Sequence, residues 1–252
     1  MSGLLRHGFA HLSPSSLNQF AGSPAAFLIE RLFGVRSTGS CAMYRGTAAE
    51  HGVEAGLFDP ALPVPECQTM ALRLYDRLSA LSADPRRETE RDAIPGLVET
   101  ALVELRAYGI PDRSEDGRQH KVSLHLPEVP VPIIGFLDFV WSDHGMIVDL
   151  KTQLRLSSAI STAHARQGAL YASATNYETR FCYTTPRKCA VYRLEDPAAH
   201  LEALRRIALT LDRFLDLSSD PLELARYLVP DLEAFWFRDA AVRAKAFEVW
   251  GL

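Results

Sequence analysis

The sequence predicts a mixed α/β domain, and three observations lead to this fold class. Apolar residues recur at intervals of three and four through about residues 12–108, as on one face of a helix. Through about residues 119–195, short apolar runs alternate with turn residues, as in strands. From about 197 onward the helical spacing returns. This order predicts a single domain over residues 1–252, with a central mixed sheet between added N-terminal and C-terminal helices.

The composition is that of a globular protein without a membrane span. Of the 252 residues, 47% are hydrophobic and 23% are charged, which is ordinary for a folded domain. No apolar run approaches the roughly 20 residues that a bilayer span needs, and the N-terminus lacks the long apolar segment of a secretory signal. We therefore expect a cytoplasmic protein with no membrane partner.

Charge and cysteine content further limit the kinds of ligand that the protein is expected to bind. The net charge of −4 excludes a globally basic nucleic-acid binder, so any DNA contact has to come from a local basic surface or from a metal in an acidic cleft. Cys41, Cys67, Cys182 and Cys189 form no CxxC pair. Free thiols in a reducing compartment are therefore favoured over a zinc or iron–sulfur site.

The helical parts carry clear start and stop residues. The Ser-Pro pairs at 13–14 and 23–24 each offer an N-cap followed by proline, and Gly34 is a C-terminal stop. Three prolines mark a linker at 60–65, and 111–119 (PDRSEDGRQ) reads as a loop. Helices are expected from 14, over about 24–33, 44–57, 67–83, 96–108 and 157–175, and again from about 197.

Five strands are expected in the middle part. They are 121–126 (KVSLHL), 133–141 (IIGFLDFVW), 146–151 (MIVDLK), 179–186 (TRFCYTTP) and 188–195 (KCAVYRLE). Asp143, His144 and Gly145 suit a tight turn between the second and third of these strands. We assign no other role to Asp143 and His144.

Three charged residues, Asp138, Asp149 and Lys151, interrupt this apolar hairpin. Residues i and i+2 of a strand share a face, so Asp149 and Lys151 point the same way, and a hairpin brings Asp138 within a cross-strand reach of about 5 Å. Two carboxylates suit Mg²⁺ or Mn²⁺, and the backbone carbonyl of Leu150 can add a ligand. The lysine can orient a water or stabilise charge on a phosphate. The alternative is a salt bridge between Lys151 and one of the acids.

Four segments resemble, in family order, the RecB-like exonuclease branch of the PD-(D/E)XK nuclease superfamily. The stretch GFLD…IVDLKT (135–152) resembles its metal-binding core, and LSPSSLNQFAGSPAAFLIERLFG (12–34) its N-terminal helix pair. RGTAAEHGVEAGL (45–57) resembles its helix with R-G-x-x-x-(H/E), and RQGALY (166–171) its Q-x-x-x-Y helix. The resemblance runs from Leu12 to about Glu195 and implies a restriction-endonuclease-like fold.

The resemblance also implies roles for five side chains of the core. Asp138 and Asp149 take the two carboxylate roles that hold the ion, and Lys151 takes the role of the catalytic lysine. The upstream helix supplies Glu50 as an extra ligand or water holder. A register shift would bring in His51 instead. Glu54 lies one turn from Glu50, where a solvated helix face is the expected environment.

Gln167 and Tyr171 are spaced i and i+4, so they share a helix face. The resemblance implies that they contact the active site or the DNA backbone. The alternative is a polar residue and an amphipathic aromatic residue that pack on the sheet.

The sequence departs from the family in its cysteines. Many RecB-like members hold an iron–sulfur cluster through one cysteine in the N-terminal helix pair and three near the C-terminus. Here Ser23 takes the first position and the C-terminal triplet is missing, so we expect Mg²⁺ or Mn²⁺ and no cluster. The chain also has no GxxxxGK[ST] motif of a helicase. It resembles a short, stand-alone nuclease of the kind that phages encode, which implies the host cytoplasm and a single-strand-annealing or recombination protein as partner.

Contacts to DNA phosphates need local positive charge. No sequence-reading module appears, so we expect recognition through the backbone and the strand end. A solvated surface charge is the alternative for each candidate. The candidate contacts are Arg45, Arg155, Arg166, Arg187 and Lys188.

Three functions compete. The first is a divalent-metal-dependent DNA exonuclease. The second is a non-catalytic DNA-binding protein that retains the nuclease fold, against which the intact D-x-K core argues. The third is a small-molecule hydrolase with His51 among its metal ligands, but the H-x-x-x-H pair of His7 and His11 has no acid nearby in sequence. Polarity, strand preference and oligomeric state are left open.

Overall fold

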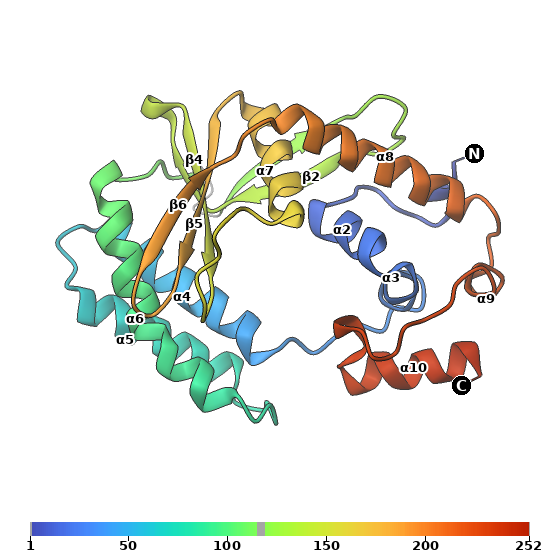
Figure 1. The fold of residues 1–252 in the computed structure, drawn as a ribbon, viewed down its shortest axis with the longest axis horizontal. Helices are drawn as coiled ribbons and strands as arrows, with labels where there is room; N and C mark the ends of the chain where they lie inside the picture. Colours follow the sequence, from blue (N-terminus) through green and yellow to red (C-terminus); the bar gives the residue numbers. More distant parts are fainter. Residues whose placement is uncertain (1, 115–118, 252) are drawn as a thin grey trace.

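The chain forms a mixed α/β fold in which helices surround two sheets, in agreement with the predicted fold class (Figure 1). The computed structural model describes residues 2–114 and 119–251. Residues 115–118 of the loop expected at 111–119 lie outside this part, as do the two end residues of the predicted domain. In this description the strands form two sheets rather than the single central sheet that the sequence suggests.

The first sheet has two strands and the second has four. Strand β1 (His120–Leu124) runs antiparallel to β2 (Ile133–Leu137). In the second sheet the order is β3-β4-β5-β6, with β4 and β5 parallel and the outer pairs antiparallel. Its strands are β3 (Phe139–Trp141), β4 (Met146–Thr152), β5 (Glu178–Thr184) and β6 (Cys189–Arg193).

Asp138 divides the single strand expected at 133–141 into β2 and β3. Continuation of the β3–β4 register would pair Leu150 with Leu137, but Leu137 pairs with His120 in the other sheet. The N–H of Leu150 instead donates to Oδ2 of Asp138 at 2.9 Å. A side-chain carboxylate therefore satisfies a backbone donor that the ladder leaves without a partner, and the chain changes sheets at this residue.

The N-terminal helices confirm most of the predicted elements, with shifted ends. Pro65 stands in the first turn of its helix rather than in a linker, because this turn needs no backbone N–H. The next helix begins near residue 87 and accommodates Pro95, so it starts well before the expected position of 96. The elements are α1 (Gly3–Arg6), α2 (Pro14–Gly22), α3 (Pro24–Arg31), α4 (Cys41–Phe58), α5 (Val64–Leu78), α6 (Arg87–Leu105) and the 3₁₀ turn η1 (Arg106–Tyr108).

The later helices follow the same pattern of confirmed elements and corrected ends. Helix α7 (Thr162–Thr175) begins five residues after the expected start at 157, where the Ser161 hydroxyl accepts the N–H of His164. The predicted turn at 142–145 is the 3₁₀ turn η2 (Ser142–His144), closed by Gly145 in a left-handed conformation. The C-terminal elements are α8 (Pro197–Leu215), α9 (Pro221–Ala225), η3 (Phe235–Phe237) and α10 (Ala240–Trp250).

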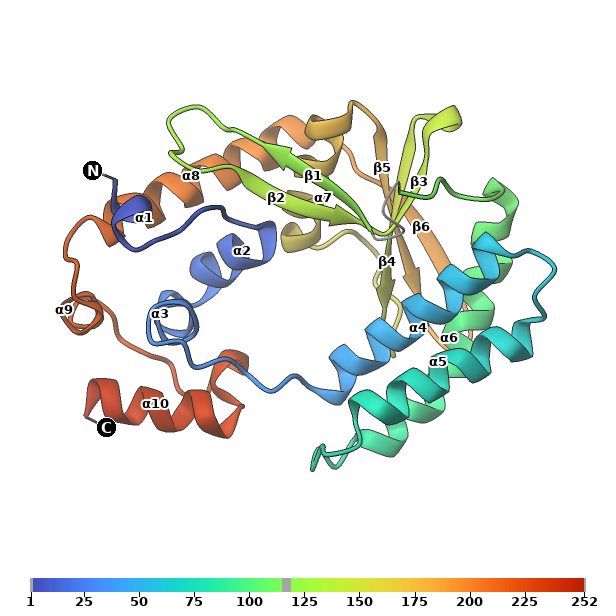
Figure 2. The same cartoon turned by 180° about the vertical axis from the view of Figure 1, so that it is seen from behind.

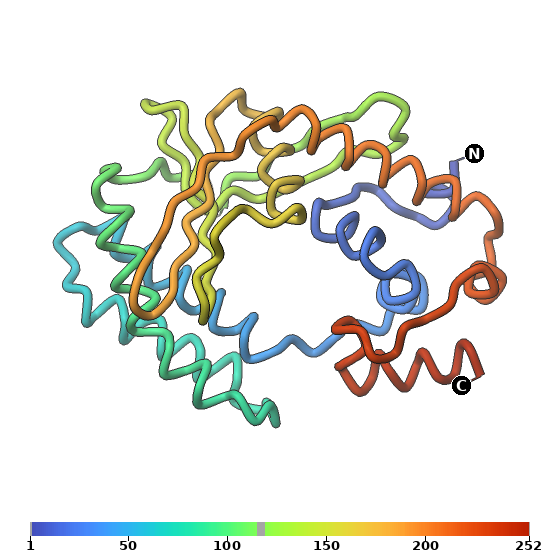
Figure 3. The backbone as a smooth tube through the Cα atoms, viewed as in Figure 1, coloured from blue at the N-terminus to red at the C-terminus, as the bar shows by residue number. Residues whose placement is uncertain are grey.

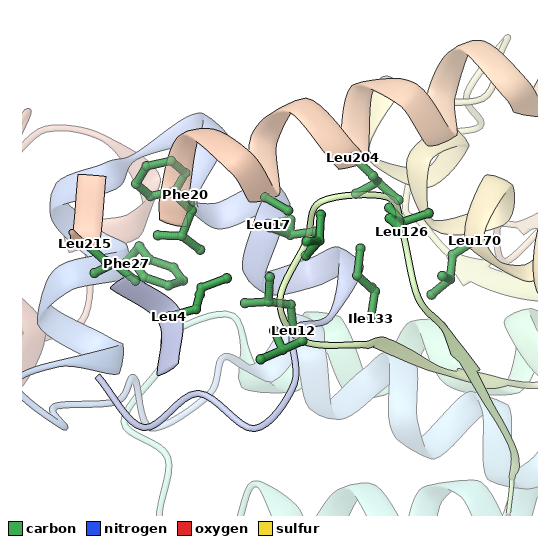
Figure 4. Close-up of a cluster of buried hydrophobic side chains, with 14 of the residues drawn as sticks. Leu4, Leu12, Leu17, Phe20, Phe27, Leu126, Ile133, Leu170, Leu204 and Leu215 are labelled. Atoms are coloured by element: carbon green, nitrogen blue, oxygen red, sulfur yellow. The ribbon is translucent and has the colours of Figure 1, made fainter. Parts of the chain in front are cut away.

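Two apolar cores cover the opposite faces of the four-stranded sheet. Leu150 and Val148 of β4 pack with α4, α5 and α6 on one face. Ile147, whose side chain points the other way, joins α7, α8, the β1–β2 sheet and the N-terminal helices, as the side chains in Figure 4 show for part of that core. Strand alternation therefore puts Asp149 and Lys151 on the α7 face, opposite the α4–α6 core.

The C-terminal part packs back onto the N-terminal part. Phe237, Val242 and Ala246 form a small core with α3, and Figures 2 and 3 show the red α10 next to the blue α3, which both views see nearly end-on. The backbone N–H and the hydroxyl of Thr38 both donate to Asp239, at 3.0 and 2.9 Å. These contacts fix the segment that joins α3 to α4. In the described residues, no helix has the length and apolarity that a membrane crossing requires.

Candidate active site

Three carboxylates and one ammonium converge at the edge of β4. Asp149 and Lys151 lie on β4, Asp138 lies at the break between β2 and β3, and Glu50 projects from α4. The two acids and the lysine that the strand pattern predicts to converge are thus brought together, and they are joined by Glu50, which lies about 90 to 100 residues earlier in the sequence. The four side chains thus come from three parts of the fold: helix α4, the break between β2 and β3, and strand β4.

Asp149 and Lys151 form an ion pair with unusual surroundings. Nζ of Lys151 lies 2.5 Å from Oδ2 of Asp149, and the Asp149 side chain is only 1% exposed. Apart from this ammonium, neither carboxylate oxygen of Asp149 has a polar partner among the described residues. Buried carboxylate oxygens without donors are costly unless another positive group completes their surroundings.

Gln119 joins the other two carboxylates. Its Nε2 donates to Oε1 of Glu50 at 2.7 Å and to Oδ1 of Asp138 at 3.2 Å. One neutral amide thus bridges two acids from opposite sides of the site. Sequence reasoning missed Gln119, because it follows a loop and belongs to no local pattern that points to chemistry.

The cluster carries more negative than positive charge, and the pKa values reflect this. Burial, together with the charge of Asp149, raises the pKa of Glu50 to about 7. Burial and the charges of Asp149 and Glu50 raise the pKa of Asp138, and burial raises that of Asp149 against the attraction of Lys151. Burial alone would lower the pKa of Lys151, but the neighbouring carboxylates outweigh it and raise this pKa. A further positive charge would relieve all three acids.

The donors here fit a hard divalent ion. Asp149 offers two buried oxygens whose one polar partner among the described residues is the Lys151 ammonium, and Asp138 lies beside it. The carbonyl of Leu150 points to the same side of β4 as its N–H, toward Asp138. No three acidic, histidine or cysteine side chains of the described chain are yet arranged to hold an ion. In this structure the carboxylates are instead engaged by the Gln119 amide and the Lys151 ammonium. To bind an ion, the carboxylates would have to give up these contacts.

The comparison with known families decides what this cluster belongs to. The model of the PD-(D/E)XK nuclease superfamily matches residues 11–239. The chain belongs to the PD-(D/E)XK nuclease superfamily. Nucleases of this superfamily use divalent ions, typically Mg²⁺ or Mn²⁺, and membership implies hydrolase activity on DNA.

Other comparisons add little to this family assignment. None of the curated proteins matches the chain. Five chains of solved structures match. One, described as the crystal structure of SSO0001, is 16% identical, with a TM-score of 0.36 over 58% of this chain and 68% of that chain.

Gln167 and Tyr171 have different places in this nuclease. Oη of Tyr171 donates to the carbonyl of Phe136 at 2.7 Å and accepts from Nε2 of Gln167 at 2.6 Å. Tyr171 is 2% exposed, and a Cβ at Gly135 would lie 2.6 Å from its ring, so the glycine of the GFLD motif makes room for the aromatic side chain. Tyr171 thus positions β2 just before Asp138. Both Tyr171 and Gln167 line the cleft described below.

The upstream helix favours Glu50 over His51. Glu50 shares Gln119 with Asp138, and its charge acts on the pKa values of Asp138 and Lys151. His51 enters none of these interactions, and Glu54 is exposed as expected, although its charge contributes to the raised pKa of Glu50. Glu50 therefore stays the proposed upstream ligand.

Arg45 does not fit its predicted role as a DNA contact. The residue is 6% exposed, and its guanidinium is paired with the carboxylate of Glu90. Its Nη2 also donates to the carbonyl of Thr152 at 3.1 Å, at the end of β4. A phosphate cannot reach a guanidinium that is buried between α4, α6 and the sheet, so Arg45 has a structural role.

The other four candidate contacts lie nearer to solvent. Arg155, Arg187 and Lys188 are exposed, the last two in the turn between β5 and β6. Arg166 is half-buried, and its Nη1 donates to Oδ1 of Asn18 at 3.1 Å, which ties α7 to α2. These four remain candidate phosphate contacts.

His7 and His11 do not form the metal-binding pair that the small-molecule hydrolase alternative would use. Nε2 of His7 contacts the carbonyls of Leu215 and Ser218, far in sequence from the acids, while His11 is exposed at the cleft. The two histidines therefore do not act as an i, i+4 pair on one helix. Among the thiols, Cys182 and Cys189 stand 3.1 Å apart across β5 and β6.

A cleft of about 680 Å³ opens over the charged cluster. Asp138 and Lys151 lie at its base, and side chains of α2, β2 and α7 form its walls. His164 is one of these wall residues, and burial lowers its pKa to about 4, so its imidazole is neutral near pH 7. The cleft gives the acids and the lysine an access route from solvent.

Proposed function

We propose that this nuclease is a divalent-metal-dependent DNA exonuclease of the RecB-like branch that hydrolyses phosphodiester bonds at strand ends. The observation that carries the proposal is the cluster of Asp138, Asp149, Glu50 and Lys151, of which Asp138 and Lys151 line the cleft. Three acids with raised pKa values around one ammonium form a site that lacks positive charge.

Each residue has a distinct role in this proposal. Asp138, Asp149, Glu50 and the carbonyl of Leu150 would hold Mg²⁺ or Mn²⁺. Such an ion supplies Lewis-acid polarisation of the phosphate and a lower pKa for a bound water. Lys151, kept protonated by the neighbouring carboxylates, donates to the phosphate oxygens or to the attacking water.

Two residues around the cluster hold it in place. Tyr171, whose pKa burial raises, stays protonated and anchors β2 through the Phe136 carbonyl. Gln167 presents its amide from the cleft wall, where it supports Tyr171 and faces the substrate side. Arg155, Arg166, Arg187 and Lys188 are the proposed contacts to DNA phosphates outside the cleft.

The RecB-like and phage-type assignment rests on the order of motifs along one domain. The helix pair α2–α3, the R-G-x-x-x-E segment of α4, the D-x-K of β4 and the Q-x-x-x-Y of α7 follow the order of that branch. With this branch come the proposed setting of DNA recombination, repair or phage DNA processing and a cytoplasmic location. A single-strand-annealing or recombination protein is the proposed partner.

A cleavage assay tests the proposal. Purified protein is incubated with end-labelled linear and closed circular DNA, single- and double-stranded, with Mg²⁺, Mn²⁺ or EDTA. Lys151→Ala and Asp149→Ala are run beside wild type, with Asp143→Ala, an exposed acid of the η2 turn, as the matched control. We expect metal-dependent shortening of linear DNA by wild type and the control alone.

Each contrary result removes a different part of the proposal. Without degradation by wild type in either metal, the nuclease function fails and the non-catalytic DNA-binding alternative gains. Full activity of Lys151→Ala and Asp149→Ala would reject the assigned site. Circular DNA cut as fast as linear DNA would reject the exonuclease.

A further inference from the structure

The wall of the cleft is aromatic and neutral rather than basic. Phe136 and Trp236 contribute two aromatic side chains, and Ser13, Asn18, His164 and Gln167 contribute uncharged polar groups. Lys151 is the one lysine or arginine among the described lining residues, and it is already paired with Asp149. Grooves that follow a duplex depend on many lysine and arginine contacts to phosphates, which this cleft lacks.

Both aromatic side chains are held in place from behind. Phe136 lies on β2 with 47% of its surface exposed, although it is a large apolar residue. Its own carbonyl is fixed by Oη of Tyr171, and its strand position by pairing with Lys121. The ring is therefore presented to the cleft on a rigid strand.

Trp236 reaches the cleft from the opposite end of the sequence. It belongs to η3, and its indole lies against α2, where Nε1 would be 3.6 Å from a Cβ at Gly22. The adjacent Phe237 is buried in the core with α3, and Asp239 is tied to Thr38. The docked C-terminal segment thus completes a cleft whose two charged cluster residues, Asp138 and Lys151, come from the middle of the chain.

We propose that this cleft binds the unpaired end of a single DNA strand, with bases stacked on Trp236 and Phe136. The inference deepens the proposed function and rests on it. Single strands are bound by aromatic side chains that stack on successive bases, because every base has a π-face. A volume of about 680 Å³ lies within the ordinary range of about 300–1,000 Å³ for small ligands. A cleft of this volume accommodates a short segment of a single strand.

In this proposal the wall of the cleft binds the strand and the base of the cleft carries the residues for hydrolysis. The aromatic side chains hold the bases, and the serine and amide groups near the start of α2 lie where the sugar–phosphate chain passes. The strand leads directly to Asp138 and Lys151. Because few cations line the cleft, binding of the strand end depends only weakly on salt compared with a basic groove.

An equilibrium binding experiment tests the inference without cleavage. Fluorescence anisotropy in EDTA compares a short labelled single-stranded DNA, a hairpin with an unpaired tail and the same hairpin with a flush end. Variants of the full chain are Trp236→Ala, Trp236→Phe and Phe136→Ala. Tyr227→Ala is the control, an aromatic residue that is 66% exposed outside the cleft.

We expect tight binding to the two DNAs with unpaired ends and weaker binding to the flush hairpin. Trp236→Ala and Phe136→Ala should each weaken binding to the unpaired ends by about 10-fold. Trp236→Phe should retain most of the affinity, and Tyr227→Ala all of it. Phe136→Ala alters an exposed side chain, so it tests stacking even if Trp236→Ala disturbs the C-terminal segment.

Equal affinity for flush and unpaired ends, or unchanged binding by both Phe136→Ala and Trp236→Ala, would overturn the inference. These outcomes differ from failure of the proposed function. If DNA were degraded but the aromatic variants bound it as wild type does, the nuclease proposal would stand and the proposed role of the cleft would fail. If binding depended on the aromatic side chains but no DNA were degraded, the single-strand binding proposal would stand and the exonuclease proposal would fail.

Discussion

Two buried ion pairs stand within a few residues of each other at the end of β4, and they differ in every respect that matters for function. Arg45 and Glu90 are 8% and 4% exposed in their side chains, with one positive and one negative charge. Lys151 and Asp149 are 21% and 1% exposed, but two more carboxylates, Asp138 and Glu50, act on them. The charges of the first pair cancel, and both side chains are buried. The second pair is surrounded by excess negative charge, and its lysine lines the cleft.

We propose that the difference separates a structural ion pair, Arg45–Glu90, from the catalytic ion pair of the proposed nuclease site, Asp149–Lys151. The Arg45 guanidinium also binds the Thr152 carbonyl, so the first pair fastens α4 and α6 to the sheet. Asp149, by contrast, has no polar partner among the described residues other than the Lys151 ammonium. A site that costs stability in this way is expected where a ligand completes it. Variants of the two pairs should therefore change different properties.

The largest contrast is expected for Asp149→Asn. Nuclease activity should fall about 1,000-fold, because metal stabilisation of the transition state is worth several kcal/mol. The midpoint of thermal unfolding should stay the same or rise, because one of three mutually repelling acids is gone. Parallel rate and unfolding measurements check this. A large drop in the unfolding midpoint would place Asp149 in the same structural class as Glu90.

Glu90→Gln should lower stability, in contrast to Asp149→Asn, which should lower activity. Leaving the buried Arg45 charge without its partner should lower the free energy of unfolding by about 3–5 kcal/mol, as measured by urea denaturation. The double variant Arg45→Met with Glu90→Leu removes both charges and should recover much of this loss. If Glu90→Gln were as stable as wild type, the pair would not fasten α4 and α6 to the sheet.

The overcharged cluster should also give the metal-free protein an unusual pH profile. The pKa of Glu50 is raised from 4.5 to about 7, so the folded state holds this proton at pH values where the unfolded state has lost it. Its stabilising effect is complete below about pH 4.5 and is lost as pH rises through 7. The raised pKa values of Asp138 and Asp149 act in the same direction.

Unfolding midpoints from pH 5 to pH 8 in EDTA should therefore decline. Glu50→Gln should flatten this decline, whereas Glu54→Gln, which removes only a minor cause of the raised pKa of Glu50, should flatten it far less. Added Mg²⁺ should oppose the decline, because it binds the deprotonated carboxylates. A midpoint that rises with pH in EDTA would contradict the assignment of raised pKa values to this cluster.

The smallest expected effect concerns Gln119. Its amide donates to Glu50 and Asp138 in place of a cation, so Gln119→Ala should raise affinity for Mn²⁺ by about 10-fold at most. Isothermal titration calorimetry measures this directly, with Gln153→Ala as control, since Gln153 bonds Ser157 outside the cluster. Weaker binding by Gln119→Ala would instead show that the amide oxygen serves as a ligand.

Much of the fold and the heart of the site could be predicted from sequence, because both rest on local periodicity. Asp149 and Lys151 had to share a face once their segment was a strand, since side chains alternate every residue. Serine and proline caps placed the starts of α2 and α3, since they satisfy the same orphan N–H groups in any fold. Family order of the motifs then added Glu50, Gln167 and Tyr171.

The helix and strand ends that differed from expectation depended on neighbours instead. Leu137 pairs with His120 in a second sheet, and this choice broke the strand at Asp138. Pro95 is accommodated inside α6, where Gln68 donates to its carbonyl at 3.0 Å. Neither partner is near in sequence, so no window of local pattern contained the information.

By itself the sequence determined the mixed α/β class, the D-x-K face and the family to which the chain belongs. Tertiary structure alone decided that Arg45 is buried against Glu90, that Gln119 bridges two acids and that Trp236 closes a cleft from the far end of the chain. The physical reason is that backbone geometry fixes which side chains share a face. Which distant side chains then meet depends on how the helices and sheets pack.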